Sequence, residues 1–167
     1  SSVSYYNKED LASFGKLLAV ITLNDNKIIQ TWSDEVKQRT DSLKAVMTKL
    51  KGKYLSFPEY SVYLNELYGY IPAYVAVKQI GNFLPKNQLK LHLKLLDETR
   101  VYSETLFTEV EEFMEALAQK ISEKENYPRE FILCCQKEEF EEYLKKGKLP
   151  AKKTLQERCN SAAQIFL

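Results

Sequence analysis

The sequence feature that most constrains the fold is a long stretch, residues 86–126, that contains neither glycine nor proline. A continuous helix over residues 85–126 would hold about 40 residues and extend about 60 Å at 1.5 Å per residue. In its second half, apolar residues alternate at spacings of three and four, which indicates one apolar stripe along a helix. The residues of this stripe are Leu106, Val110, Phe113, Leu117 and Ile121. Because other helices have to cover such a stripe, the stretch predicts a helical bundle.

The composition agrees with long helices in a single chain of 167 residues. Five glycines and five prolines are too few for a turn-rich all-β fold. A formal net charge of +1 removes the usual electrostatic argument for a nucleic-acid or anionic-membrane partner. Lysines do cluster at residues 49–53 and 145–148, and we interpret both clusters as solvated helix ends, where cations favour the helix dipole.

The three cysteines, Cys134, Cys135 and Cys159, form a poor disulfide framework because their number is odd and two are adjacent. Nothing resembles a secretory signal, and the apolar run at residues 17–21 is far too short to span a bilayer. These observations predict free thiols, a cytoplasmic location and no membrane partner.

Three further helices are expected before the long one. The first, capped by Asn7, ends at the polar run Asn24-Asp25-Asn26. The second covers about residues 27–51, with Ile29, Val36, Leu43 and Leu50 in a heptad seam that ends before Gly52. The third opens at Ser56 with a proline in its first turn and continues to residue 80. Pro72 cannot donate to the helix ladder, so a kink or brief break is expected between Tyr68 and Pro72, made easier by Gly69.

The pattern changes after residue 127. A short apolar run at residues 131–135 allows at most a short strand, and short helices are expected from residue 136 to Gly147 and from residue 149 onward. Residues 164–167 are apolar and are expected to begin a strand of a further domain. The predicted fold is all-α: about four long helices, the third kinked near Pro72, plus a small C-terminal segment of short helices. The predicted segments are a bundle over residues 1–126 and a short-helix segment over residues 127–167.

No catalytic, cofactor-binding or metal-binding set can be assembled from the sequence. The single histidine, His92, lies between leucines without a second ligand at metal-binding spacing, and it is interpreted as a packed or surface side chain. Gly52, Gly69, Gly81 and Gly147 are isolated and are interpreted as helix breakers, since no phosphate loop surrounds them. Three charged residues share one helix face, where they predict an ion-pair network or, alternatively, an anion contact through the arginine. They are Asp97, Arg100 and Glu104.

Six tyrosines lie between residues 54 and 74. Four of them are candidates for an interaction surface: Tyr60, Tyr63, Tyr68 and Tyr74. The alternative is a large helix interface in which each hydroxyl finds a partner.

The last third of the chain resembles a segment of the phosphoenolpyruvate-utilising phosphotransferases, which include phosphoenolpyruvate synthase, pyruvate phosphate dikinase and rifampin phosphotransferase. In that family a hydrophobic run leads to a helix with paired glutamates, then to a basic G-x-L-P turn and a helix carrying x-L-x-x-R. The matching pieces here are Ile132-Leu133, residues 138–144, Gly147 to Pro150, and Leu155 with Arg158. The long helix with Arg100 and Glu104 also resembles the family's central helical region.

The resemblance implies a non-catalytic helical linker that positions a phosphohistidine carrier domain in an ATP- or phosphoenolpyruvate-dependent phosphotransferase. Its partners would be neighbouring domains of a larger polypeptide, and the chain itself would hold no cofactor. The family's Ser-His context is absent, so no catalytic role passes to His92. The alternative is a stand-alone helical adaptor that binds a partner protein through an apolar or tyrosine-rich face.

Overall fold

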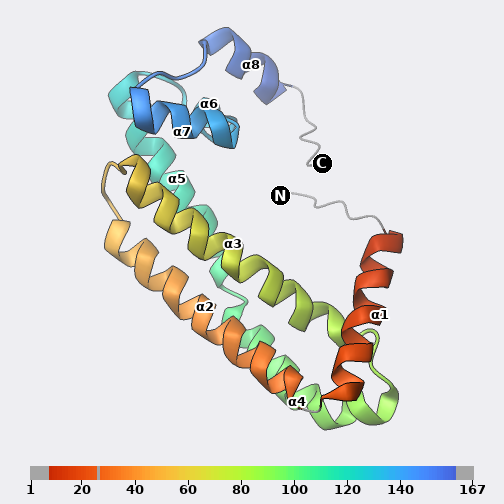
Figure 1. Cartoon of the computed structure of the whole chain (residues 1–167). Helices are drawn as coiled ribbons and strands as arrows, with labels where there is room; N and C mark the ends of the chain where they lie inside the picture. Colours follow the sequence, from red (N-terminus) through yellow and green to blue (C-terminus); the bar gives the residue numbers. More distant parts are fainter. Residues whose placement is uncertain (1–7, 26, 161–167) are drawn as a thin grey trace. The chain divides into compact units, whose positions relative to one another are not determined.

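The computed structural model describes residues 8–25 and 27–160, which form eight helices and, within those ranges, no strand (Figure 1). The predicted all-α class is therefore confirmed. The helices are α1 (Lys8–Asn24), α2 (Ile28–Leu50), α3 (Phe57–Ile80), α4 (Lys86–Ser103), α5 (Leu106–Glu125), α6 (Arg129–Leu133), α7 (Lys137–Lys146) and α8 (Lys152–Asn160). The predicted Asn7 cap and the predicted strand at residues 164–167 lie outside the described residues.

The chain divides into two compact units. Unit 1 consists of Ser1–Lys44 and Asn65–Leu106, and unit 2 consists of Ala45–Leu64 and Phe107–Leu167. The units differ from the predicted segments 1–126 and 127–167, because the first 126 residues contribute to both of them. Helices α1 and α4 belong to unit 1, and helices α5 to α8 belong to unit 2, apart from Leu106.

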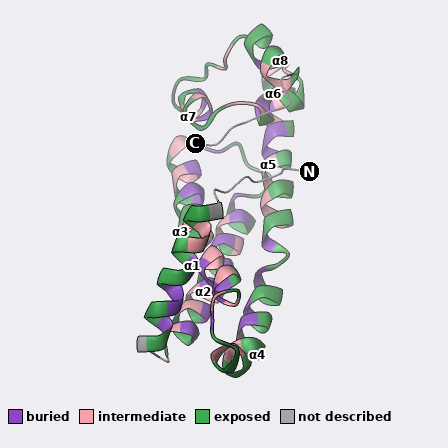
Figure 2. Cartoon of the chain, turned by 90° about the vertical axis from the view of Figure 1, so that its right-hand side faces the viewer, coloured by how far each residue is buried: buried purple, intermediate pink, exposed green. Residues whose placement is uncertain are grey.

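The heptad seam of α2 is confirmed. All four predicted seam residues, Ile29, Val36, Leu43 and Leu50, are buried, and buried residues recur between exposed ones along the helices in Figure 2. The same seam also buries two hydroxyl residues that the apolar pattern did not include, Ser33 and Thr40. Thr40 satisfies its hydroxyl by donating to the carbonyl of Val36 at 2.8 Å. The seam therefore continues at alternating steps of four and three even where the side chain is polar.

The prediction of one continuous helix over residues 85–126 is wrong. Helix α4 ends at Ser103 and α5 begins at Leu106, although no glycine or proline separates them. The Ser103 hydroxyl donates to the carbonyl of Thr99 at 3.1 Å, and the N–H of Glu104 turns to the carbonyl of Val101, a tighter three-residue step. Serine side chains that bond back to the preceding turn compete with the backbone ladder and bend helices. These bonds coincide with the end of the helix.

Helix α3 starts as predicted, but the predicted brief break before Pro72 does not occur. The backbone N–H and the hydroxyl of Ser56 both donate to Glu59 Oε2, at 2.9 and 2.7 Å, in a capping-box arrangement. The helix then continues from Phe57 to Ile80 without a break at Pro72. Gly69 lies inside the helix and is not a breaker, whereas Gly52 and Gly147 follow helix ends with φ of 76° and 67°.

In unit 1, polar contacts join the packed helices. The Tyr102 hydroxyl on α4 donates to Asp41 Oδ1 on α2 at 2.6 Å. The Tyr70 hydroxyl on α3 donates to the Ser103 carbonyl at 3.5 Å, and burial raises the pKa of Tyr70 to about 12. A side chain at Gly15 of α1 would collide with the Phe83 ring, so this glycine allows the ring to lie against the helix. Hydrogen bonds thus connect α2 with α4 and α3 with α4.

In unit 2, aromatic rings form the packing centre. The Tyr63 ring lies 4.9 Å from that of Phe113 on α5, and the Tyr60 ring lies 5.0 Å from that of Phe140 on α7. Such centroid distances are those of favourable aromatic pairs. The apolar run at residues 131–135 is helical at its start and not a strand, because α6 turns Ile132 into the core and contacts α8.

Candidate functional site

The residues that carry the family resemblance meet at one polar junction in unit 2. Arg158 on α8 forms a bidentate ion pair with Glu139 on α7, at 2.6 Å to Oε2 and 3.0 Å to Oε1. The same guanidinium donates to the carbonyl of Cys134, just after α6, at 2.9 Å. One arginine therefore holds three short helices together. We call Arg158, Glu139 and the Cys134 carbonyl the Arg158 junction.

Local sequence places Glu139 for this role. Its Oε2 also accepts the backbone N–H of Gln136 at 2.8 Å, which caps the start of α7. The hydrogen bond from Arg158 and, to a lesser extent, the Gln136 N–H hold the pKa of Glu139 below its ordinary value, against partial burial that acts the other way. The same bond raises the pKa of Arg158. Both groups carry their charges at neutral pH, so the junction is an ion pair with defined geometry.

The remaining residues of the resemblance have structural roles around the junction. Gly147 ends α7 in the left-handed conformation and its N–H donates to the carbonyl of Tyr143 at 2.7 Å. The carbonyl of Pro150 accepts the Tyr127 hydroxyl at 3.1 Å, and Leu155 is fully buried. Lys152 donates to the carbonyl of Asn126 at 2.6 Å. These contacts tie the turn before α8 to the end of α5.

The prediction of three free thiols is wrong. Cys134 and Cys159 form a disulfide across 25 residues, with their Cα atoms 6.1 Å apart, and Cys135 is the free cysteine. Adjacent cysteines rarely pair with each other, but the contact between α6 and α8 brings Cys159 to Cys134. Burial raises the pKa of the Cys135 thiol to about 11. The cytoplasmic location stays a prediction, without the support that free thiols lent it.

The predicted charged network on α4 is partly assembled. Arg100 Nη2 lies 3.9 Å from Asp97 Oδ1, with both side chains more than half exposed. Glu104 follows the last residue of α4 and is exposed. An exposed pair at this distance contributes about 0–1 kcal/mol. The alternative use of Arg100 as an anion contact stays a prediction.

The four candidate tyrosines do not share a surface. Tyr60 and Tyr63 are buried in the aromatic packing of unit 2 and are therefore wrong as surface residues. Tyr68 is about half exposed, and Tyr74 stacks on Tyr70 with ring centroids 5.5 Å apart. The burial of Tyr60 and Tyr63 agrees with the alternative interpretation, in which these tyrosines belong to a helix interface.

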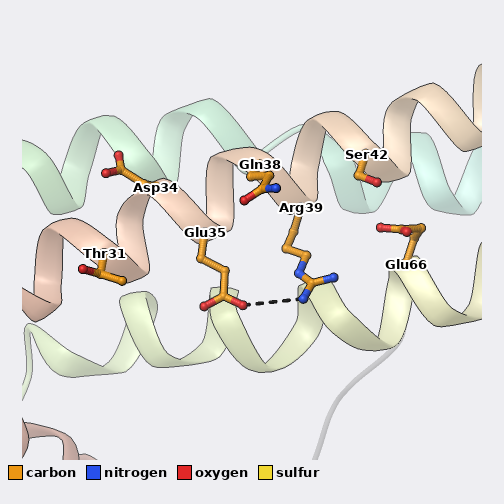
Figure 3. Close-up of a pocket in the computed structure, with 7 residues that line it drawn as sticks. All are labelled: Thr31, Asp34, Glu35, Gln38, Arg39, Ser42 and Glu66. Carbon is orange, nitrogen blue, oxygen red and sulfur yellow. Dashed lines mark ion pairs between the residues drawn. The ribbon is translucent and has the colours of Figure 1, made fainter.

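Unit 1 carries a polar groove between α2 and α3 (Figure 3), with a volume of about 630 Å³. Arg39 is its central residue, 3.7 Å from Glu35, and its guanidinium lies over Gly69 on α3, where a Cβ would be 3.0 Å from Nη1. Gly69 thus gives room to an arginine instead of breaking the helix. The groove is lined by Thr31, Asp34, Glu35, Gln38, Arg39, Ser42 and Glu66. Sequence reasoning missed it, because its residues appear as an ordinary solvated helix face.

Across residues 8–25 and 27–160, no group of three or more His, Cys, Asp or Glu side chains could hold a metal ion. In the same part of the chain, every helix lacks the combination of length and apolarity that crossing a bilayer requires. His92 lies on α4 and is half-buried.

With this geometry established, comparison with known proteins gives no relative. No protein-family model, curated protein or solved structure matches the sequence.

Proposed function

We propose that this chain is a non-catalytic helical linker and scaffold of a phosphoenolpyruvate-utilising type of phosphotransferase, in which it positions a phosphohistidine carrier domain. The observation that carries the proposal is the Arg158 junction. Glu139 and Arg158 come from separate pieces of the resemblance, and they form one ion pair that also binds the end of the apolar run. The separate pieces of the resemblance thus meet in one packed unit, which supports the proposal.

The partners of these residues favour a scaffold role. Arg158 Nη1 donates to the Cys134 carbonyl and to Glu139, and Nη2 donates to Glu139, so both nitrogens bind groups of this chain. Leu155 and Gly147 contribute burial and a helix end. Such residues fix how α8 packs on α6 and α7, and a rigid end of this kind is the property that a linker before a moving domain requires. ATP or phosphoenolpyruvate would bind elsewhere in the parent protein.

The proposal is tested on the natural protein that contains this chain. The protein is incubated with phosphoenolpyruvate labelled with ³²P, or with ATP labelled at the β-phosphate, and the labelled polypeptide is identified by peptide mapping. We expect an acid-labile, base-stable label, as phosphohistidine gives, on the polypeptide that contains residues 8–160. A polypeptide that ends at Leu167 and takes up no label with either donor would contradict the proposal.

The second candidate is the adaptor, and helix α1 favours it. Five large apolar side chains of this helix are more than one third exposed. They are Phe14, Leu17, Val20, Ile21 and Leu23. A run of exposed apolar residues on one helix is typical of a protein-interaction site.

The adaptor is tested with the doubly substituted chain L17K/V20K. Light scattering and pull-down should show a complex with the unsubstituted chain and none with the variant. The matched control is L91K/L93K, which changes two exposed leucines of α4. A partner captured equally by all three chains would refute the role of α1 and leave the scaffold proposal unaffected.

A further inference from the structure

A small pocket in unit 2 is lined by apolar and aromatic side chains and by one lysine. Its volume is about 150 Å³. Its lining includes buried Leu55 and Ile121 and the aromatic side chains of Tyr54 and Tyr143. Lys124 of α5 and Leu144 with Gly147 at the end of α7 complete the lining. We call it the Lys124 pocket.

Two lysines of α5 are held near the exposed Tyr54 ring. Lys120 Nζ lies 5.3 Å from the ring centroid and also donates to the carbonyl of Gly52. Lys124 Nζ lies 5.7 Å from the Tyr54 centroid and 5.9 Å from the Tyr143 centroid. These distances are those of cation–π contacts. The rings therefore orient Lys124, which lines the pocket, and Lys120, which lies beside the Tyr54 ring.

The stretches of chain that line the pocket, with their neighbours, carry more lysines than glutamates. The stretches 49–59, 119–125 and 141–148 contain eight lysines and five glutamates, whereas the whole chain is nearly neutral. The two lysine clusters interpreted above as separate helix ends belong to these stretches, and Lys145 Nζ lies 3.8 Å from the Phe57 ring centroid. Contacts between the loop at residues 51–56, α5 and α7 thus gather charges that lie far apart in the sequence.

Among the glutamates of these stretches, Glu125 contacts both Lys124 and Tyr143 of the pocket lining. Glu125 Oε1 accepts the Tyr143 hydroxyl at 3.0 Å and lies 3.4 Å from Lys124 Nζ. Glu125 is therefore the residue whose neutralisation should change the affinity of the pocket for a charged ligand in a known direction.

We propose that the Lys124 pocket binds an aryl ligand that carries a phosphate or a similar anionic group. The ring would lie against the Tyr54 side of the pocket and the anion at Lys124, with Lys120 nearby on the same Tyr54 ring. The size supports this class, because a volume of about 150 Å³ accommodates one benzene ring. Two sources share this chemistry: a small aryl phosphate and a phosphotyrosine side chain of a protein. The inference is independent of the proposed scaffold function.

The test titrates the full chain with phenyl phosphate, phenol and inorganic phosphate at low ionic strength and follows the amide signals of Tyr54 and Tyr143 by NMR. We expect phenyl phosphate to bind at least about tenfold more tightly than either fragment, since charge and burial act together. The variant K120Q/K124Q should lose about tenfold in affinity for phenyl phosphate. The variant E125Q should gain affinity, and K153Q, on exposed Lys153 of α8, should match the unsubstituted chain.

Each alternative outcome has a defined meaning. Equal affinity for phenol and phenyl phosphate would refute the anion site, and equal affinity for inorganic phosphate would refute the aryl pocket. Unchanged binding in K120Q/K124Q would refute the assignment to this pocket, provided that its melting temperature shows a folded chain. A phosphotyrosine peptide that binds more tightly than phenyl phosphate would identify a protein side chain as the source, and equal affinity would identify a small molecule.

Discussion

The long helices of unit 1 and the short helices at residues 127–160 of unit 2 are stabilised in different ways. In unit 1, apolar seam residues recur turn after turn, so each contact is one of many similar ones. In residues 127–160, no helix exceeds ten residues, and isolated helices of that length are marginal in water. A few specific ties hold them instead: the Arg158 junction, the Cys134–Cys159 disulfide, and the bonds of Tyr127 and Lys152. Many similar apolar contacts stabilise unit 1, whereas a few individual side chains stabilise residues 127–160.

The largest expected effect tests the seam. Leu43 is fully buried on α2, so L43A should lower the free energy of unfolding by about 2–5 kcal/mol, through lost burial and the cavity that remains. Denaturant titration followed by circular dichroism measures it. The matched control is L17A on α1, where an exposed side chain should cost about 0.5 kcal/mol or less. A loss below 1 kcal/mol in L43A would mean that the seam is not the main source of stability.

The second effect tests the disulfide. Replacing Cys134 and Cys159 by serine opens a closed loop of 25 residues and should destabilise the short helices by about 3 kcal/mol. Hydrogen exchange should rise at α6 and α8 and stay unchanged in α2 and α4, which would separate the two regions directly. Thiol titration of the oxidised, unfolded chain should count one free thiol, that of Cys135. Three free thiols would show that the disulfide does not form.

The same contrast explains how far the sequence predicts the structure. The heptad at Ile29, Val36, Leu43 and Leu50 predicted α2, because period and burial are both encoded locally. The Arg158 junction could not be predicted, since Glu139 and Arg158 are 19 residues apart and nothing local specifies that they meet. Gly69 was misinterpreted for the same reason: its role is to make room for Arg39, a residue of another helix.

The third effect tests the charge of the junction. The hydrogen bond from Arg158 lowers the pKa of Glu139, so the stabilisation is complete above the ordinary value of 4.5 and is lost as the pH falls through the lowered pKa. The variant E139Q should lower the free energy of unfolding by about 1–2 kcal/mol at pH 7, since the pair is about three-quarters buried. Below pH 4.5 its difference from the unsubstituted chain should shrink. The control is E142Q, whose exposed pair with Lys146 should contribute little. A difference that stayed constant between pH 7 and pH 3 would show that Glu139 acts through shape and not through charge.

The smallest effect tests the break between α4 and α5. If the Ser103 hydroxyl ends the helix by bonding to the carbonyls of Thr99 and Arg100, S103A should extend helical structure into residues 104–105. The change in stability should stay within about 0.5 kcal/mol, because alanine also favours the helix. The ¹³Cα shifts of Glu104 and Thr105 report the change. The alternative cause is the Tyr70 hydroxyl, which bonds to the Ser103 carbonyl, and Y70F isolates it. Helical shifts in Y70F but not in S103A would assign the break to a contact from α3. The helix end would then depend on tertiary structure, as the Arg158 junction does, and not on the local sequence.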